Sequence, residues 1–142
     1  MNDFEPVVLG SGEVSIRDRR SGEIMHPGLG PEREAELLYV RQTRLAERLR
    51  ESTSEPLRVL DVGLGAATNA LAMIRCAEET PPTRELRLTS LERDDGALRL
   101  ALADPEHFPL QARHQVLMGR MREAILAGRF AALVQEMRAL WA

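Results

Sequence analysis

The most constraining feature of this chain is the stretch LDVGLGAATN, which runs from Leu60 to Asn69. It continues an apolar run that begins at Leu57, and it places Gly63 and Gly65 directly before a segment of helical pattern. A short, nearly continuous apolar strand is typical of a parallel sheet that is covered on both faces. Glycine lets a backbone take a positive φ or come close to a ligand. The stretch therefore predicts a strand, a ligand-binding turn and a helix, in that order.

The following segments extend this pattern to a βαβ unit. Strands are predicted at Leu57–Val62 and Leu86–Leu91, joined by a helix at Ala66–Glu79. A further helix is predicted at Asp94–Asp104, with Asp94 or Asp95 as its N-cap. Strand, glycine turn, helix and strand together indicate an α/β protein with a Rossmann-like fold.

The N-terminal part is expected to hold a β-hairpin and a helix. Strands are predicted at Glu13–Asp18 and Gly22–His26, on either side of the turn-like RRSG. Pro31 suits the first turn of a helix that runs to about residue 50. Four apolar residues fall near helical spacing within it: Ala35, Leu38, Leu45 and Leu49.

The 142 residues, 44% of them hydrophobic, are expected to form a single domain with a modest core. We divide it into an N-terminal hairpin (1–30), a βαβ core with its preceding helix (31–104) and a helical segment (105–142) with a break near Gly128. Only two strands of parallel-sheet character are found. The domain is therefore expected to be an incomplete half-fold of Rossmann-like type.

Composition excludes several classes of function. The formal charge of −3 predicts no polyanion partner by itself, and all 19 basic residues are arginine, which we attribute to codon usage. Cys76 is the single cysteine, so an internal disulfide and a cysteine-based zinc site are excluded. His107 and His114 lack a second ligand at metal spacing, so no metal is expected. No apolar run reaches the roughly 18 residues of a membrane span, and the acidic start is no signal peptide, so we expect a cytoplasmic protein without membrane contact.

The residues around the glycine turn distinguish two ligands. In the dinucleotide fingerprint G-x-G-x-x-G the third glycine allows close helix–strand packing, but Thr68 occupies that place here. Asp61 precedes Gly63 by two positions, and a carboxylate beside a pyrophosphate is repelled by the phosphates. S-adenosylmethionine carries an ammonium group and no phosphate, so the acid favours it. An aspartate that only makes local turn hydrogen bonds is the plainer interpretation.

The pattern Asp61-x-Gly63-x-Gly65-x-Ala67 is similar to the first motif of class I methyltransferases. This resemblance implies that the incomplete domain is a Rossmann-like class I methyltransferase half-fold. Ala67 stands where a third glycine is usual, a mild replacement if its φ is negative. Glu92, at the tip of the second strand, is placed to accept two hydrogen bonds from a ribose diol. It follows the first glycine by 29 residues, against about 20 in the fingerprint, because of the loop EETPPTRE. A solvated strand end that helps to cap the next helix is the alternative.

A more specific resemblance follows from the order of short motifs over about residues 10–110. SGEIMH, GPEREAELLYV, LRVLDVGLGAATNAL, LTSLERD and FPL occur in the order found in the methyltransferase domain of MnmC-like proteins. The resemblance implies S-adenosylmethionine as the cofactor and methyl transfer to the aminomethyl group of a tRNA wobble uridine. The predicted cofactor site then consists of His26, Glu34, Asp61, Gly63, Leu64, Gly65, Asn69, Glu92 and Arg93.

The sequence departs from that family after Glu92, where no Asp-Gly-Phe-x-Pro-like segment follows. In the family this segment helps to form the acceptor pocket, so no catalytic residue is assigned here. The RDRR turn, Arg17–Arg20, is a candidate contact for tRNA phosphates, although hairpin turns also collect solvated charges.

Two alternatives of other classes stay open. One is an NAD-binding Rossmann oxidoreductase. The other is a non-catalytic methyltransferase-like association module, which would expose an apolar sheet edge or helix face. Such an edge also predicts homo-oligomers. Binding of S-adenosylhomocysteine or of NAD distinguishes the three.

Overall fold

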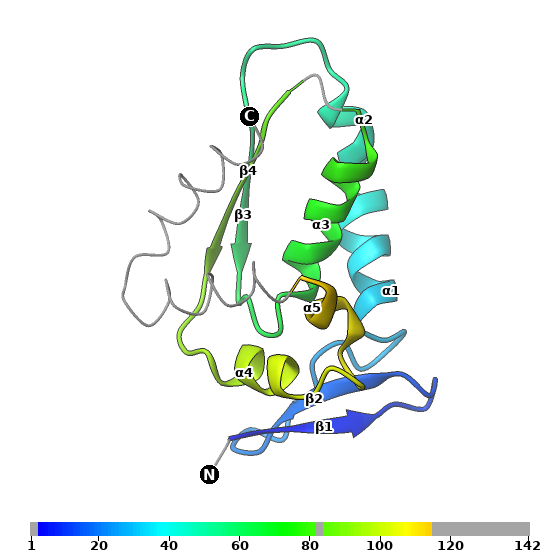
Figure 1. Ribbon diagram of the computed structural model, residues 1–142, viewed down its shortest axis with the longest axis vertical. Helices are drawn as coiled ribbons and strands as arrows, with labels where there is room; N and C mark the ends of the chain where they lie inside the picture. The colour runs from blue at the N-terminus through cyan, green and yellow to red at the C-terminus, as the bar shows by residue number, and fades with distance from the viewer. Residues whose placement is uncertain (1–2, 82–83, 115–142) are drawn as a thin grey trace.

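The computed structural model describes residues 3–81 and 84–114 (Figure 1). These residues form two small sheets and several helices. Strands β1 (Phe4–Val8) and β2 (Val14–Asp18) make an antiparallel hairpin, and β3 (Leu57–Val62) and β4 (Leu86–Leu91) make a parallel pair. The hairpin lies beyond the carboxyl ends of β3 and β4, where the arrowheads point in Figure 1.

The βαβ unit has the predicted strand boundaries and connection. β3 and β4 pair in parallel from Leu57 opposite Leu86 to Val62 opposite Leu91. The helix between them, α3 (Thr68–Glu79), buries most of its side chains, as its apolar composition predicts. The mixed α/β architecture, with a small parallel sheet and packed helices, is that of a Rossmann-like half-fold.

The expectation that both faces of the parallel sheet are covered is wrong for the described residues. Burial alternates along β3, because Leu57 packs against the helices while Leu60 and Val62 are 62% and 73% exposed. On β4, Leu91 is 54% exposed. Successive side chains of a strand point to opposite faces, so helices on one face leave the other face open.

The N-terminal hairpin pairs differently from the prediction. The hairpin partner of β2 is the preceding strand β1, and not the following segment Gly22–His26; Val8 pairs with Val14 across the β1–β2 turn. Residues 22–26 follow the other side of β2 through the isolated bridge between Arg17 and Ile24, three backbone hydrogen bonds and the hydrogen bond from the Ser15 hydroxyl to the Met25 carbonyl. β1 contains Pro6, which an edge strand tolerates because one side of it makes no ladder bonds.

The predicted helix of residues 31–50 is interrupted. Helix α1 (Pro31–Ala35) begins with Pro31 in its first turn and continues as a π-helical segment, η1 (Glu36–Arg41). Arg44 then takes φ 54° before α2 (Leu45–Leu49). The wider π turn places the next buried residue five positions after Ala35, at Val40. Leu38, expected on the apolar face, is 48% exposed.

Two further helices follow β4. α4 (Gly96–Ala103) has Asp95 at its N-cap position, as predicted, but the side chain that bonds its first N–H is that of Asp94, at 3.0 Å. α5 (Pro109–Arg113) lies within the predicted helical segment of residues 105–142. Most of that predicted helix and its break near Gly128 lie outside the described residues. Among those described, no helix is long and apolar enough to cross a membrane.

One of the apolar clusters ties the hairpin to the rest of the fold. It joins both hairpin strands to α4 and to the loop before α5, through the buried residues Phe4, Ile16, Ala97, Ala101 and Phe108. The hairpin is thereby held across the end of the parallel sheet, next to the glycine turn.

Candidate functional site

The glycine turn leaves β3 at the carboxyl edge of the parallel sheet, beside the end of β4. The Gly63 N–H donates to the Leu91 carbonyl at 2.8 Å, which continues the ladder one residue beyond the strand. Ligands of open α/β sheets bind outside the carboxyl ends of the strands. The fold thus places the sequence motif at the edge where such a ligand is expected.

Three residues of the turn have left-handed backbone conformations. Gly63 has φ 82°, Gly65 has φ 54° and Ala67 has φ 65°. The two glycines adopt these angles at no steric cost. The negative φ that would make Ala67 a mild replacement is not found, and this residue closes the turn as the N-cap of α3 and is fully buried there.

Replacing Ala67 with glycine is expected to change the free energy of unfolding by less than about 1 kcal/mol. A left-handed conformation costs an L-residue roughly 1–2 kcal/mol, and relief of this cost offsets the loss of one buried methyl group, about 0.8 kcal/mol. Ala70→Gly is the matched control, because Ala70 is equally buried but lies inside α3. Ala70→Gly should lower the free energy of unfolding by about 2 kcal/mol. Urea unfolding measures both, and equal losses would contradict the strain at Ala67.

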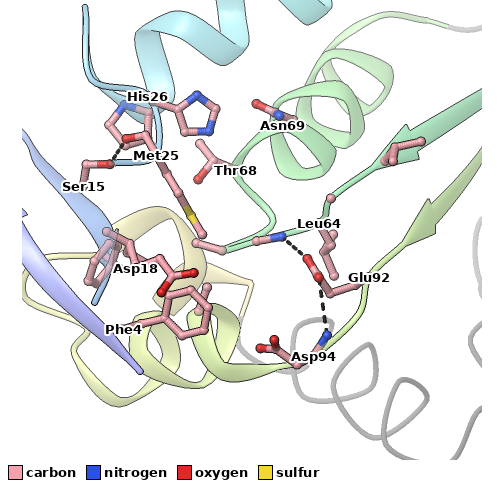
Figure 2. Close-up of a pocket in the computed structure, with 18 of the residues that line it drawn as sticks. Phe4, Ser15, Asp18, Met25, His26, Leu64, Thr68, Asn69, Glu92 and Asp94 are labelled. Carbon is pink, nitrogen blue, oxygen red and sulfur yellow. Dashed lines mark hydrogen bonds between the residues drawn. The ribbon is translucent and has the colours of Figure 1, made fainter. Parts of the chain in front are cut away.

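Glu92 reaches across from β4 to the glycine turn (Figure 2). Its Oε2 accepts the Gly65 N–H at 2.7 Å, and its Oε1 accepts the N–H groups of Arg93 at 2.6 Å and Asp94 at 3.4 Å. Glu92 thus joins the end of β4 to the glycine turn, and its predicted contact with a ribose stays a prediction. The carboxylate also holds the start of the loop after β4 through the N–H groups of Arg93 and Asp94. This local role is close to the alternative interpretation of Glu92 as a strand end next to the following helix.

Asp61 occupies a different position from the one that its predicted role needs. Its side chain is buried in β3 and accepts the Ser90 hydroxyl at 2.8 Å, and it does not line the cavity described below. Burial raises the pKa of the Asp61 carboxyl, the hydrogen bond from Ser90 opposes this, and the nearby charge of Glu92 adds to the rise. A direct contact with a ligand ammonium stays a prediction.

A cavity of about 410 Å³ opens at the glycine turn, between the parallel sheet and the hairpin (Figure 2). Seven of the nine predicted site residues line it: His26, Gly63, Leu64, Gly65, Asn69, Glu92 and Arg93. Of the other two, Asp61 lies within the sheet and Glu34 lies behind His26, at 3.2 Å from its ring. The sequence motifs thus converge on one cavity.

Several lining residues were not anticipated. They come from the hairpin, the loop after it and the loop before α5: Phe4, Asp18, Met25 and Phe108. The apolar stretch FEPVV could have indicated a strand that contains Phe4, but Pro6 within it argues against a strand. Gln111 was also missed, and it closes the base of the turn by donating to the Ala66 carbonyl at 2.9 Å and to Thr68 at 3.1 Å.

Among solved structures, the crystal structure of MnmC2 from Aquifex aeolicus is similar to this chain. The TM-score is 0.56 at 23% sequence identity, over 66% of this chain and 31% of that chain. The fold is MnmC-like. The chain thus spans less than half the length of this neighbour, and the likeness concerns the fold alone. No family model and no curated protein matches the sequence.

Proposed function

We propose that the cavity at the glycine turn binds S-adenosylmethionine, and that the chain is the cofactor-binding part of a methyltransferase that acts on an aminomethyl-uridine of tRNA. The observation that carries this proposal is the contact between the glycine turn and Glu92 at the carboxyl ends of two parallel strands. At this edge of a sheet, an acidic side chain can bind the ribose of a nucleoside while a glycine turn lets the backbone come close to the ligand.

The residues present fit such a ligand in size and shape. The cavity volume of about 410 Å³ lies within the roughly 300–1,000 Å³ of small-molecule sites. A Cβ added to Gly63 would meet no atom within 4 Å, so the space beside this backbone is open. The Asn69 Oδ1 is buried and has no hydrogen-bond partner among the described residues, which leaves an acceptor for a ligand donor at the start of α3.

The charges around the cavity favour a cationic ligand. Three carboxylates line it, those of Asp18, Glu92 and Asp94, against the single arginine Arg93 among the described lining residues. S-adenosylmethionine carries a sulfonium and an ammonium group, whereas NAD brings two phosphates. The argument against NAD therefore rests on these three carboxylates, since Asp61 does not line the cavity.

When bound, S-adenosylmethionine supplies an activated methyl group. The task of the protein is then to hold the ligand and its acceptor in line, which is catalysis by positioning. Glu92 is suited to hold a ribose hydroxyl, because a carboxylate offers about four lone-pair directions and the N–H groups of Gly65, Arg93 and Asp94 occupy three of them. Calorimetric titration with S-adenosylhomocysteine and with NAD tests the proposal. Binding of NAD alone would overturn it.

Replacing Glu92 with alanine is expected to weaken S-adenosylhomocysteine binding by about 1.5–3 kcal/mol, the range for hydrogen bonds to charged groups. The 2′,3′-dideoxy analogue of this ligand is the matched control, because it cannot donate ribose hydroxyls. It should bind the wild type and Glu92→Ala with equal affinity.

The same substitution removes the acceptor of the Gly65 N–H, so stability must be measured beside binding. Glu92→Gln retains an acceptor for this N–H and should restore stability more fully than affinity. Equal losses of affinity for both ligands would show that Glu92 acts through folding and not through the ribose.

The tRNA part of the proposal rests on the resemblance and on the arginines near the end of β2. Arg17 and Arg19 pair with Glu5 at 3.3 and 2.9 Å, and Arg20 lies 3.6 Å from Asp3. These pairs lie at partly exposed side chains. Surface pairs of this kind contribute little, so phosphates can replace the carboxylates at small cost.

A second candidate function is that of an association module. The observation that favours it is the open sheet face of the described residues, with the exposed side chains of Leu60, Val62 and Leu91. Exposed apolar patches mark interaction sites, and association of two copies through this face or the adjoining strand edge is the form we propose. The same titration separates the candidates, because a module without a cofactor binds neither ligand.

A further inference from the structure

His26 and Glu34 form a side-chain pair at the rim of the cavity. The His26 Nδ1 lies 3.2 Å from the Glu34 Oε2, and both side chains are mostly buried, at 22% and 18% exposure. The Glu34 Oε1 accepts the N–H groups of Gly28 and Leu29, each at 3.0 Å. The carboxylate is therefore held by the loop, and it holds the imidazole in turn.

The backbone of His26 is in a conformation that L-residues rarely adopt, with φ 51°. The preceding carbonyl, that of Met25, accepts the Ser15 hydroxyl and so anchors the residue to β2. A strained residue persists only where its surroundings determine it, and such residues cluster at ligand sites. The strain turns the ring of His26 to the side of the cavity that Thr68 and Asn69 also line (Figure 2).

The pair determines which ring nitrogen is available. An ionised carboxylate only accepts hydrogen bonds, so we expect the His26 Nδ1 to be the donor in the bond to Glu34. In the neutral ring the Nε2 then has a free lone pair. No hydrogen bond to this nitrogen is found within residues 3–81 and 84–114. A base oriented by a carboxylate beside a cavity is the arrangement used for proton transfer.

We infer that the His26–Glu34 pair receives a primary ammonium group of a ligand bound in this cavity. The inference rests on the proposed function for the identity of that ligand. Nε2 accepts a hydrogen bond from the ammonium and can take its proton. In that step an N–H bond of the ammonium breaks and its electron pair stays on the nitrogen. The new imidazolium is balanced by Glu34.

The charged groups that face His26 across the cavity support an ammonium. Asp18 comes from the hairpin, and Glu92 and Asp94 come from the loop after β4, while Arg93 is the single arginine among the described lining residues. Arg20 lies 3.7 Å from Asp18 and 3.9 Å from Asp94, so Glu92 is the lining carboxylate for which no ion pair is found within the described ranges. The N–H of Arg20 holds the pKa of Asp18 below its ordinary value, so this carboxylate is charged at neutral pH. A cation is thus attracted to the cavity before it meets the histidine.

Two sources can supply this ammonium: the amino-acid part of the cofactor and the aminomethyl group of the acceptor. Four probes separate them. S-adenosylhomocysteine carries the amine of the first source, and 5′-methylthioadenosine lacks it. 5-Aminomethyluridine carries the amine of the second source, and uridine lacks it.

The decisive variant is His26→Asn. Asparagine tolerates a positive φ but cannot act as a base. We expect this variant to lower the affinity for the amine-bearing probe by about 10- to 100-fold, the equivalent of one hydrogen bond to a charged group. Its affinity for the matching probe without the amine should be unchanged. His107→Asn is the matched control, because His107 pairs with Asp104 at 2.8 Å but does not line this cavity. It should bind all four probes as the wild type does.

The nitrogen resonances of His26 give a second measurement that does not depend on a variant. They should report a proton on Nδ1 in the free protein and a shift at Nε2 when the amine-bearing probe is added. Glu34→Gln should abolish the preference for the Nδ1 proton, while its amide oxygen still accepts the loop N–H groups.

The outcomes separate the two proposals. If the wild type binds the probes and His26→Asn binds every one of them equally well, the inference is wrong and the proposed function stands. If the wild type binds none of the four, both fail. A proton on Nε2 in the free wild type also overturns the inference.

Discussion

Replacing Gly63 with valine is expected to abolish measurable binding of S-adenosylhomocysteine. The residue lines the cavity, and the space beside its backbone is open, with no atom within 4 Å of an added Cβ. A valine side chain would fill the volume through which a ligand approaches the turn. Filling that volume removes the contacts of the ligand with the turn altogether, so we expect a loss of at least about 100-fold, or roughly 3 kcal/mol.

The substitution also strains the backbone, because Gly63 has φ 82° and valine is strongly disfavoured at positive φ. Gly12→Val is the matched control. Gly12 has φ 86° with no atom within 4 Å of an added Cβ, but it lies in the β1–β2 turn and does not line the cavity. It should lose stability to a similar degree and keep its affinity.

Calorimetry at a temperature where both variants are folded separates strain from occlusion. Circular dichroism establishes that temperature for each variant. Undiminished affinity of folded Gly63→Val would refute the assignment of the site to this turn, whereas loss of affinity in Gly12→Val would show that strain alone explains the effect.

The βαβ unit could be predicted from the sequence because its signals are local. The apolar runs at Leu57–Val62 and Leu86–Leu91 are bounded by turn residues, and the glycine pair stands directly after the first of them. Parallel strands with one helical connection have a nearly fixed handedness. The meeting of Glu92 with Gly65 follows from that topology, since both come from carboxyl ends of adjacent strands.

The interrupted helix and the hairpin could not be predicted in the same way. The π-helical segment changes the spacing of buried residues from four to five between Ala35 and Val40, and no residue type signals this. Pairing of β1 with β2 depends on contacts of Phe4 with the distant α4 and the loop before α5. Tertiary packing of this kind overrides local propensity.

The contacts of two site residues, Glu34 and Asp61, also could not be predicted from the sequence. Glu34 was expected at the cofactor, and in the structure its carboxylate contacts the ring of His26 and accepts two loop N–H groups. Asp61 was expected at the ligand, and its side chain faces Ser90 inside the sheet. In both cases the motif indicates where the residue lies in the fold, but its hydrogen-bond partner belongs to a different segment of the chain.

The 142-residue chain by itself is not expected to methylate tRNA. Parallel strands are stable mainly inside larger sheets that are covered on both faces. Among the described residues β3 and β4 pair only with each other, and Leu60 and Val62 are exposed on the open face. The unpaired strand edges are templates for another strand or for a second copy of the chain.

Methyl transfer to an amine requires the acceptor to be held in line with the methyl group, and small misplacements are costly. The family that the sequence resembles uses a segment after the second strand to build the acceptor pocket, and this sequence has no such segment after Glu92. The described residues form the cavity that we propose for the cofactor, with His26 in its lining, and Leu91 at the end of β4 is exposed. We therefore expect this chain to bind the cofactor without transferring its methyl group to tRNA.

A radioactive methyl-transfer assay tests this expectation, with tRNA that carries the aminomethyl group and lacks the methyl group. The same preparation must bind S-adenosylhomocysteine, so that inactivity is not mistaken for misfolding, and a complete MnmC-type methyltransferase serves as the positive control. We expect no incorporation above that of a heat-inactivated sample. Turnover by the purified chain would show that two parallel strands and the cavity beside them suffice to position the acceptor, and that the open sheet face is not a missing wall of the active site.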